Sequence, residues 1–238
     1  SYDVEEKRVI AAVRNKALQL AQGNYIGIID DDEFAPSTWL VGLYRAIHTF
    51  DVDGALGPVF PFFERQPPRW LLKSGLCEPQ LHRTGKLLHW TQCYTGNCLV
   101  MRKVFDDHNL RFDENFRTGG SDQDFFRRAM ALGYRFVAVQ EAPVYEVVPP
   151  ERWEASYWVK RALVNGFNSW RYVRGKNIGL QIKLATKSFV AVPLYVLGMV
   201  FVCCLGRHAL VRFLEKGAYH LSRACAACGL ELWKTRDF

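Results

Sequence analysis

Short apolar runs and amphipathic stretches alternate along residues 1–150. Residues 5–22 place apolar side chains at helical spacing and stop before Gly23, and a second amphipathic stretch runs from Pro36 to about Thr49. Short apolar runs predict strands at residues 25–29, 54–60 and 134–139, and residues 90–102 predict a strand that is interrupted at Gly96-Asn97. The run at 25–29 is typical of a buried strand in a parallel sheet. Helices that alternate with short apolar strands predict an α/β sandwich.

The stretch GGSDQDFFRRAMALGY, residues 119–134, predicts a further helix with both ends marked. Ser121 follows two glycines and is a preferred N-cap residue, and Gly133 is placed to end the helix after about Leu132. Asp124 stands three residues after Ser121, which nearly matches a capping box. We therefore expect Asp122 in the first turn of a helix.

The C-terminal part has a different pattern. Residues 188–206 form a stretch of 19 residues without a charge, which at about 1.5 Å per residue barely crosses a hydrocarbon core of about 30 Å. Basic residues flank both ends, so the charges choose no orientation, and Pro193 can bend the segment back toward one face. Residues 208–228 place leucines and basic side chains on opposite sides, as an interfacial helix on anionic lipid does. The alternative is a buried core helix with a solvated basic face.

The distribution of charge favours the membrane interpretation. The net charge is +7, with 17 basic and 19 acidic residues in positions 1–150 but 14 basic and 5 acidic residues in positions 151–238. This excess indicates an acidic partner for the C-terminal part. We expect an anionic membrane surface and no nucleic acid, because no recognised nucleic-acid motif accompanies the charge. We assign residues 1–175 to a catalytic domain and residues 176–238 to a membrane-associated helical region.

Four consecutive carboxylates follow the first predicted strand, with no basic residue within ten positions on either side: Asp30, Asp31, Asp32 and Glu33. In open α/β sheets, ligands bind outside the carboxyl ends of the strands. A tight cluster of hard oxygen ligands suits Mg²⁺ or Mn²⁺, which hold substrate phosphates through one or two carboxylates. Capping of the helix that starts at Pro36 is the structural alternative, but it accounts for only one or two of these acids.

Asp122 is the second candidate for chemistry. Two glycines precede it, so the backbone can approach a ligand closely, and a carboxylate in that place can act as a general base. The structural alternative is that Asp122 and Asp124 only complement the N-terminus of their helix. Spacing does not choose between the two interpretations.

Four motifs in this order resemble a family 2 glycosyltransferase of the bacterial exopolysaccharide, succinoglycan-biosynthesis type. They are GNYIGIIDDDE with the helix before it, then YTGNCLVMR, then GGSDQDFFRR, and then VVPPERW followed by VKRALVNGFNSW. The resemblance covers about residues 5–175. It implies the glycosyltransferase A-type fold, a Rossmann-like sandwich. It also implies a nucleotide-sugar donor, a divalent cation and inversion at the anomeric carbon.

The resemblance implies roles for the two acidic motifs. Asp30 and Asp32 match the acids of the DxD motif, so both are expected at the metal, with Asp30 also near the donor ribose. Asp31 lies between them on the donor side. Asp122 matches the catalytic base, although Ser121 stands where the family commonly has glutamate.

Other matched positions surround these acids. On the acceptor side we expect Gly96, Asn97 and Asp124. On the donor side we expect Arg14, from the RN motif of the first helix. Two further arginines fall in a region that could approach the diphosphate, with surface charge as the alternative: Arg152 and Arg161.

The family's first strand, its PTYNR-like turn and a second strand ending in an acid do not appear in this sequence. We therefore expect an N-terminally incomplete fold, as a fragment of a longer protein or a truncated copy. The resulting hypothesis is a metal-dependent inverting glycosyltransferase at the cytoplasmic face of a bacterial inner membrane, acting on a lipid-linked saccharide or polysaccharide. The alternatives are a catalytically inactive, membrane-associated fragment of such an enzyme, and a nucleotidyltransferase that releases pyrophosphate.

Overall fold

The computed structural model describes residues 3–117, 119–175, 177–230 and 232. The chain forms two compact units. The first consists of Ser1–Phe62 and Glu78–Val147, and the second of Phe63–Cys77 and Val148–Phe238. The α/β class predicted from the sequence is confirmed in the first unit, whereas the second unit is helical in the part that the structure describes.

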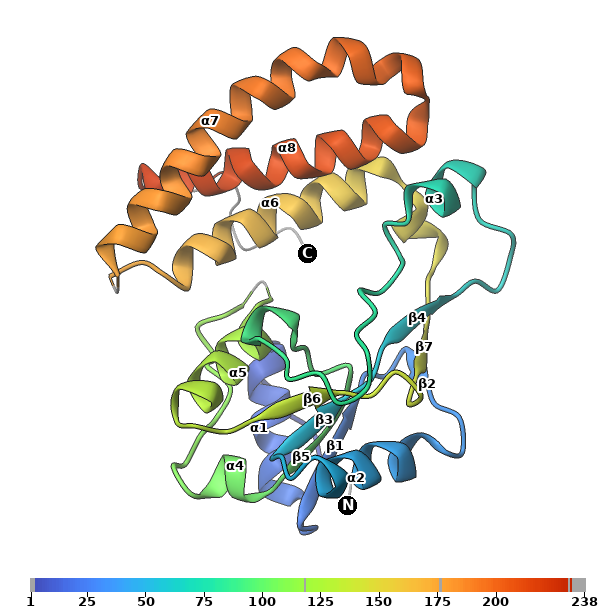
Figure 1. Ribbon diagram of the computed structural model, residues 1–238, viewed down its shortest axis with the longest axis vertical. Helices are drawn as coiled ribbons and strands as arrows, with labels where there is room; N and C mark the ends of the chain where they lie inside the picture. Colours follow the sequence, from blue (N-terminus) through green and yellow to red (C-terminus); the bar gives the residue numbers. More distant parts are fainter. Residues whose placement is uncertain (1–2, 118, 176, 231, 233–238) are drawn as a thin grey trace. The chain divides into compact units, whose positions relative to one another are not determined.

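A four-stranded sheet forms the centre of the first unit (Figure 1). In spatial order its strands are β1 (Tyr25–Ile29), β5 (Asn97–Met101), β3 (Gly54–Leu56) and β6 (Phe136–Ala138). β5 runs antiparallel to both neighbours, and β3 and β6 are parallel. Within the described residues β1 is an edge strand with one antiparallel neighbour, and Gly27 and Ile29 are exposed. The prediction of a buried strand in a parallel sheet is therefore wrong for 25–29.

Helices cover both faces of this sheet: α1 (Ile10–Leu20), α2 (Trp39–Thr49), α4 (Lys103–Asp106) and α5 (Ser121–Ala131). Neighbouring side chains of a strand point to opposite faces. Accordingly, Cys98 and Val100 of β5 share a core with α1, α4 and α5, whereas Leu99 shares a second core with α2. The first unit is thus a three-layer sandwich with the sheet in the middle.

The predicted strand 54–60 is divided between two sheets. After Gly57 and Pro58 the chain continues as β4 (Val59–Phe62), which lies in a three-stranded sheet with β7 (Val144–Val147) and β2 (Glu33–Phe34). β7 is central, parallel to β4 and antiparallel to β2. A Cβ atom at Gly57 would lie 1.9 Å from the Ala142 carbonyl oxygen, so only glycine lets the chain pass here.

Two element ends differ from the prediction near the N-terminus and before β5. α1 is shorter than 5–22 and ends at Leu20 with an extended C-cap residue, so Gly23 does not terminate it. The interrupted strand predicted at 90–102 is a strand only in its second part: β5 begins at Asn97, where the break was expected, whereas Trp90–Gln92 form the 3₁₀ helix η1.

The start of α5 also differs. Ser121 is the first helical residue, and Gly120, with φ of 90°, takes the N-cap position without a side-chain cap. A capping box needs Ser121 at the N-cap position. Because Ser121 is already the first helical residue, no capping box forms between Ser121 and Asp124. Gly133, with φ of 96°, follows the end of the helix as predicted.

The second unit consists of α3 (Arg69–Ser74), η2 (Pro150–Trp153), α6 (Ala155–Arg171), α7 (Ile178–Val202), η3 (Cys203–Leu205) and α8 (Arg207–Ala227). α8 packs against both α6 and α7 (Figure 1). α6 therefore belongs with the C-terminal helices, so the compact units divide at Val147 and not at residue 175. The predicted amphipathic helix 208–228 corresponds to α8.

α7 is long, apolar and exposed. Its 25 residues extend about 37 Å at about 1.5 Å per residue, and by length and composition it is able to cross a membrane. Large side chains such as Leu197 and Phe201 are 68% and 77% exposed. The predicted apolar segment 188–206 is not one helix, because α7 ends at Val202 and Gly206, with φ of 95°, precedes α8.

Side-chain contacts join α7 to α8 in antiparallel register. The ring centroids of Tyr195 and Phe213 lie 4.7 Å apart. Nearer the start of α7, the Ser188 hydroxyl accepts a hydrogen bond from Arg223 Nε at 2.7 Å. Arg223 is only 4% exposed, and its guanidinium also contacts His220 Nδ1 at 3.3 Å. The two helices form a hairpin along this stretch of α7.

Candidate functional site

Asp30, Asp31 and Asp32 form the turn between β1 and β2, and Glu33 begins β2. The Glu33 amide donates to the Asp30 carbonyl oxygen at 3.2 Å, and the Asp30 amide donates to Glu33 Oε2 at 3.0 Å. Asp31 is exposed, whereas Asp32 is partly buried and its carbonyl oxygen accepts from the Val147 amide at 2.9 Å. These bonds hold the turn in one shape and attach it to the end of β7.

Arg14 brings a positive charge to this turn from α1. Its Nη2 atom donates to Asp30 Oδ1 at 3.2 Å, and its side chain is only 16% exposed. The guanidinium also lies over the ring of Phe112, 5.7 Å from the centroid. The acids lack a basic neighbour in sequence, but the fold supplies one.

Asp122 lies near both of these residues. Burial raises the pKa of Asp122, the Arg14 guanidinium lowers it, and the Asp30 carboxylate raises it. Its own carboxylate accepts a hydrogen bond from the Gln123 amide at 2.8 Å. Asp30, Arg14 and Asp122 therefore form one electrostatic cluster, built from the end of β1, the middle of α1 and the first turn of α5.

Glu33 adds a third carboxylate to the cluster. Burial raises the pKa of Glu33 to about 7, helped by the nearby charges of Asp30, Glu146 and Asp32. Sequence reasoning counted Glu33 among the four acids but gave it no role of its own. The density of acids in the turn was the available signal, since crowded carboxylates raise one another's pKa.

Gly96 keeps one side of these carboxylates open. A Cβ atom at Gly96 would lie 2.6 Å from Glu33 Oε1 and 3.4 Å from Asp30 Oδ2. The two oxygens thus face the same small space beside the backbone. Gly96 was expected on the acceptor side, and the structure places it directly against the acidic turn.

Asn97 has a buried side chain whose hydrogen bonds all stay inside the protein. Its Oδ1 accepts from Trp39 Nε1 at 2.7 Å, and its Nδ2 donates to the carbonyl oxygens of Pro58 and Ala142 at 2.9 and 2.8 Å. These contacts join α2, the loop after β3 and the loop before β7. They favour a structural role, and the acceptor contact expected for Asn97 stays a prediction.

Asp124 is likewise occupied by internal contacts. Its two oxygens accept from Arg127 Nη2 at 2.6 Å and from Arg128 Nε at 2.7 Å, and the side chain is buried. Pairs of opposite charge three and four residues apart face each other along a helix, so these contacts give Asp124 a structural role within α5. Its expected acceptor role stays a prediction.

Arg152 and Arg161 belong to the second unit. Arg152 lies over the ring of Tyr157 and Arg161 over that of Trp158, 5.9 and 5.6 Å from the centroids. Both arginines thus have aromatic partners within their own unit. Their approach to a diphosphate stays a prediction.

The carboxylates can hold a cation only together with further oxygens. In the described part of the chain, no group of three or more His, Cys, Asp or Glu side chains is placed to hold a metal ion. Asp30 Oδ2 and Glu33 Oε1 nevertheless face one space beside Gly96. Mg²⁺ commonly binds one or two carboxylates and takes its remaining ligands from water and phosphate. The arrangement fits a cation that is shared with a phosphate-bearing ligand.

Comparisons with known proteins place the chain among glycosyltransferases. Residues 2–109 match the model of the family described as Glycosyl transferase family 2. The chain is 30% identical over 178 residues to succinoglycan biosynthesis protein ExoM of Rhizobium meliloti (strain 1021), covering 72% of this chain and 55% of that protein. It is 26% identical over 159 residues to ExoU of the same organism, covering 60% and 44%. The chain thus spans about half the length of the curated relatives it matches.

The chain also aligns with solved structures of TarS of S. aureus. Residues 1–349 of that protein, in complex with UDP, align with a TM-score of 0.44 and 14% identity over 95% of this chain and 73% of that chain. The same protein has been solved in complex with UDP-GlcNAc, with a TM-score of 0.42. At these values the similarity supports no conclusion about ligands of this chain.

Proposed function

Because the chain belongs to glycosyl transferase family 2, we propose that it transfers a sugar from a nucleotide-sugar donor to a hydroxyl group of a lipid-linked saccharide or polysaccharide. The names of ExoM and ExoU, both succinoglycan biosynthesis proteins, support a place in bacterial exopolysaccharide synthesis. The observation that carries the proposal is the cluster of Asp30, Arg14 and Asp122.

Asp122 is the proposed general base. A hydroxyl group has a pKa far above neutral, so it needs a positioned carboxylate to take its proton as it attacks. The acceptor oxygen forms a bond to the anomeric carbon, its proton passes to Asp122, and the bond from that carbon to the diphosphate oxygen breaks. A single displacement of this kind inverts the anomeric configuration. Partial burial, which raises the pKa of Asp122, makes it a stronger base than an exposed aspartate.

Asp30, Asp31 and Asp32 form the proposed donor side. Asp30 and Asp32, with Glu33 beside them, would hold Mg²⁺ or Mn²⁺ together with the donor diphosphate. When bound, the cation neutralises the charge that develops on the leaving diphosphate. Arg14 holds Asp30 in place through its hydrogen bond, and its positive charge reduces the electrostatic repulsion among the neighbouring acids.

Replacing Asp122 by Asn tests this assignment. The purified chain is incubated with Mn²⁺ and a panel of UDP-, GDP- and dTDP-sugars, and donor binding and nucleotide-sugar hydrolysis are measured. We expect Asp122→Asn to keep donor binding and to lose about 10²- to 10⁴-fold in turnover, the usual contribution of a general base. Asp51→Asn is the matched control, because Asp51 is exposed and asparagine tolerates its φ of 48°.

Three outcomes would contradict the proposal in different ways. Near-normal turnover of Asp122→Asn would remove Asp122 from the mechanism. Release of pyrophosphate would indicate a nucleotidyltransferase. Absence of both donor binding and hydrolysis in the wild-type chain would favour a catalytically inactive fragment.

We also propose that the α7–α8 hairpin attaches the chain to an anionic membrane at the cytoplasmic face. Exposed apolar side chains of α7 would enter the lipid, and exposed basic side chains such as Lys183 and Arg212 would meet the headgroups. α8 lies along α7, so a spanning α7 would carry Arg223 toward the bilayer centre, where a charge is costly. A hairpin lying in the interfacial plane avoids this cost.

Vesicle flotation tests the attachment. We expect binding to vesicles that contain phosphatidylglycerol, weaker binding to pure phosphatidylcholine, and loss of binding in Leu197→Glu. Leu132→Glu is the control, since Leu132 is also exposed but lies in the first unit. Alkaline carbonate should extract the bound chain from the vesicles. A chain that resists carbonate would contradict the in-plane arrangement.

A further inference from the structure

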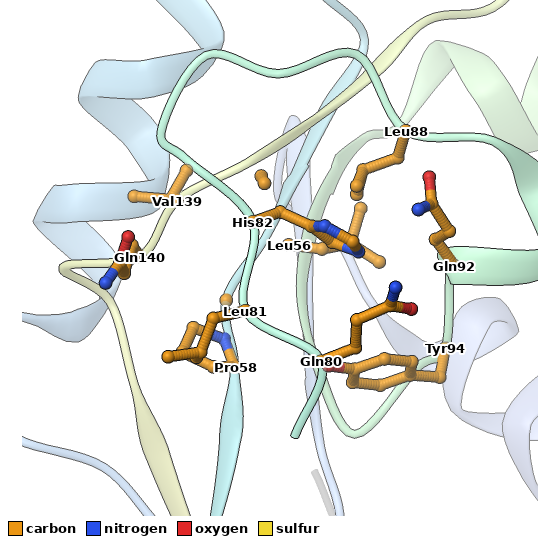
Figure 2. Close-up of a pocket in the computed structure, with 12 residues that line it drawn as sticks. Leu56, Pro58, Gln80, Leu81, His82, Leu88, Gln92, Tyr94, Val139 and Gln140 are labelled. Atoms are coloured by element: carbon orange, nitrogen blue, oxygen red, sulfur yellow. The ribbon is translucent and has the colours of Figure 1, made fainter. Parts of the chain in front are cut away.

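A pocket in the first unit lies outside the acidic turn, at the ends of the parallel strands β3 and β6 (Figure 2). Leu56 and Ala138, which are paired across these two strands, both line it. Residues 80–82, in the connection between α3 and η1, close one of its other sides. Gln92 and Tyr94, in the segment just before β5, close another. The carboxyl ends of parallel strands are a usual place for ligands.

The pocket combines polar and apolar side chains. In Figure 2, Gln80, Gln92 and Tyr94 lie on one side with Leu88 beside them, and the ring of His82 points toward the two glutamines. Pro58, Leu81 and Val139 lie on the opposite side together with Gln140. A sugar ring has the same two characters, with hydroxyl groups on its edges and C–H groups on its faces.

The lining carries no net charge at neutral pH. Burial raises the pKa of Tyr94 to about 12, so the phenol stays protonated. Burial, together with the nearby charge of Lys86, lowers the pKa of His82, so the imidazole stays neutral. Among the lining residues there is no Asp, Glu, Lys or Arg. Lys86 contacts His82 Nδ1 through its Nζ atom at 3.1 Å but is not among the lining residues. A lining of neutral side chains suits a neutral ligand, because a buried anion needs a charged or hydrogen-bonding partner.

Two polar side chains of the pocket have hydrogen-bonding capacity to spare. Among the described residues, no other protein group hydrogen-bonds to the half-buried Tyr94 hydroxyl or to the exposed Gln80 carboxamide. Gln92, by contrast, accepts a hydrogen bond from the His89 amide at 3.0 Å, so part of its amide is used to hold η1. Tyr94 and Gln80 are therefore the groups able to bind hydroxyls of a ligand.

The pocket is also close to the proposed reaction site. The charge of Glu33 contributes to the raised pKa of Tyr94, and the charge of Asp122 contributes to that of the neighbouring Cys93. The geometry agrees, because Gln123, the residue after Asp122, donates from Nε2 to the Thr91 carbonyl oxygen at 3.5 Å, and a Cβ atom at Gly96 would lie 2.6 Å from Glu33 Oε1. The segment that carries Gln92 and Tyr94 thus runs between the surroundings of both acids.

We propose that this pocket, the Tyr94 pocket, binds the edge of a neutral pyranose ring of the acceptor, with Tyr94 and Gln80 as specificity-determining residues. The assignment of this sugar to the acceptor rests on the proposed glycosyl transfer. Binding of the sugar itself can be measured without turnover. A neutral pyranose could also come from the donor, so the experiment separates the two sources.

Saturation-transfer NMR on the full chain in detergent, with methyl β-D-glucopyranoside as the probe, tests the binding. We expect transfer signals with the wild-type chain and a loss of about three- to tenfold in affinity for Tyr94→Phe and for Gln80→Ala, the range of one neutral hydrogen bond. Gln19→Ala, on the exposed face of α1, is the matched control and should bind as the wild type does. Absence of binding, or equal binding by all variants, would overturn the pocket assignment.

Competition separates acceptor from donor. A nucleotide sugar whose own transfer signals confirm its binding is added, and in a second sample only the nucleoside diphosphate. If the pocket serves the acceptor, neither compound displaces the glucoside. Displacement by the nucleotide sugar alone would assign the pocket to the donor and overturn the acceptor role. Failure of every nucleotide sugar to bind would contradict the proposed function. Sugar binding by the pocket would then be judged from the comparison of the wild type with Tyr94→Phe alone.

Discussion

Replacing Asn97 by Ala should destabilise the protein and not selectively weaken a ligand. The change removes three internal hydrogen bonds, of 2.7, 2.9 and 2.8 Å. The Pro58 carbonyl oxygen keeps a second bond, from the Val144 amide at 3.0 Å, so it stays satisfied. The Trp39 indole N–H and the Ala142 carbonyl lose their partner, and each unsatisfied buried group costs about 1–3 kcal/mol.

The expected loss for Asn97→Ala is therefore about 3 kcal/mol in the free energy of unfolding. For a chain of this size that corresponds to a fall in Tm of about 6–12 °C. Urea titration and thermal unfolding, both followed by circular dichroism in detergent, measure it. Asn165→Ala is the control, because Asn165 is exposed on α6 and its replacement should change stability by less than about 0.5 kcal/mol.

The result that would refute this reasoning is specific. An Asn97→Ala chain with unchanged stability but a raised KM for acceptor would show that the amide serves the ligand. The role expected from the sequence would then be correct, and the three internal bonds would be of little energetic weight. A loss of stability with an unchanged KM would establish a structural role for Asn97.

Close packing and burial in the first unit lead to three more expectations, one at Gly57 and two at the acidic turn. Gly57→Ala should prevent folding of the first unit, since its Cβ would lie 1.9 Å from a backbone oxygen; a cooperative melt at the wild-type Tm would contradict this. Glu33→Gln removes a group whose pKa burial raises to about 7, so the folded wild type holds a proton that the unfolded chain releases at lower pH. Wild-type stability should therefore fall as pH rises from about 4.5 to about 7, and urea midpoints of Glu33→Gln should lack this fall; an equal fall in both would count against it. Gly96→Ala should displace Glu33 and weaken Mn²⁺ binding measured by calorimetry with nucleoside diphosphate present, and wild-type affinity would exclude this cation position.

The elements that the sequence predicted best are those with a strong periodic pattern. α2 and α8 lie close to their expected bounds, because each has one apolar stripe and a polar remainder. Strands were predicted less well. A short apolar run at 25–29 does not reveal whether its neighbour is parallel or antiparallel, and the division after Leu56 depends on a backbone approach at Gly57 that only the fold shows.

The candidate site divides in the same way. Asp30, Asp32 and Asp122 could be selected from residue type and motif order alone. The pairing of Arg14 with Asp30 could not be derived from spacing, because it depends on how α1 crosses the end of β1. Nor did the sequence distinguish the buried, internally bonded amide of Asn97 from a ligand contact, since both place an asparagine at the start of β5.

The path of the chain matters for anyone who wishes to work with the α/β sandwich by itself. Phe63–Cys77 leaves that unit and rejoins it, and its Trp70 and Leu71 share a small core with Trp158 and Val211. A chain that ends after Val147 would therefore expose these two large apolar side chains to water, which favours aggregation. A soluble piece requires a second edit, in which a short polar linker replaces residues 63–77 between Phe62 and Glu78.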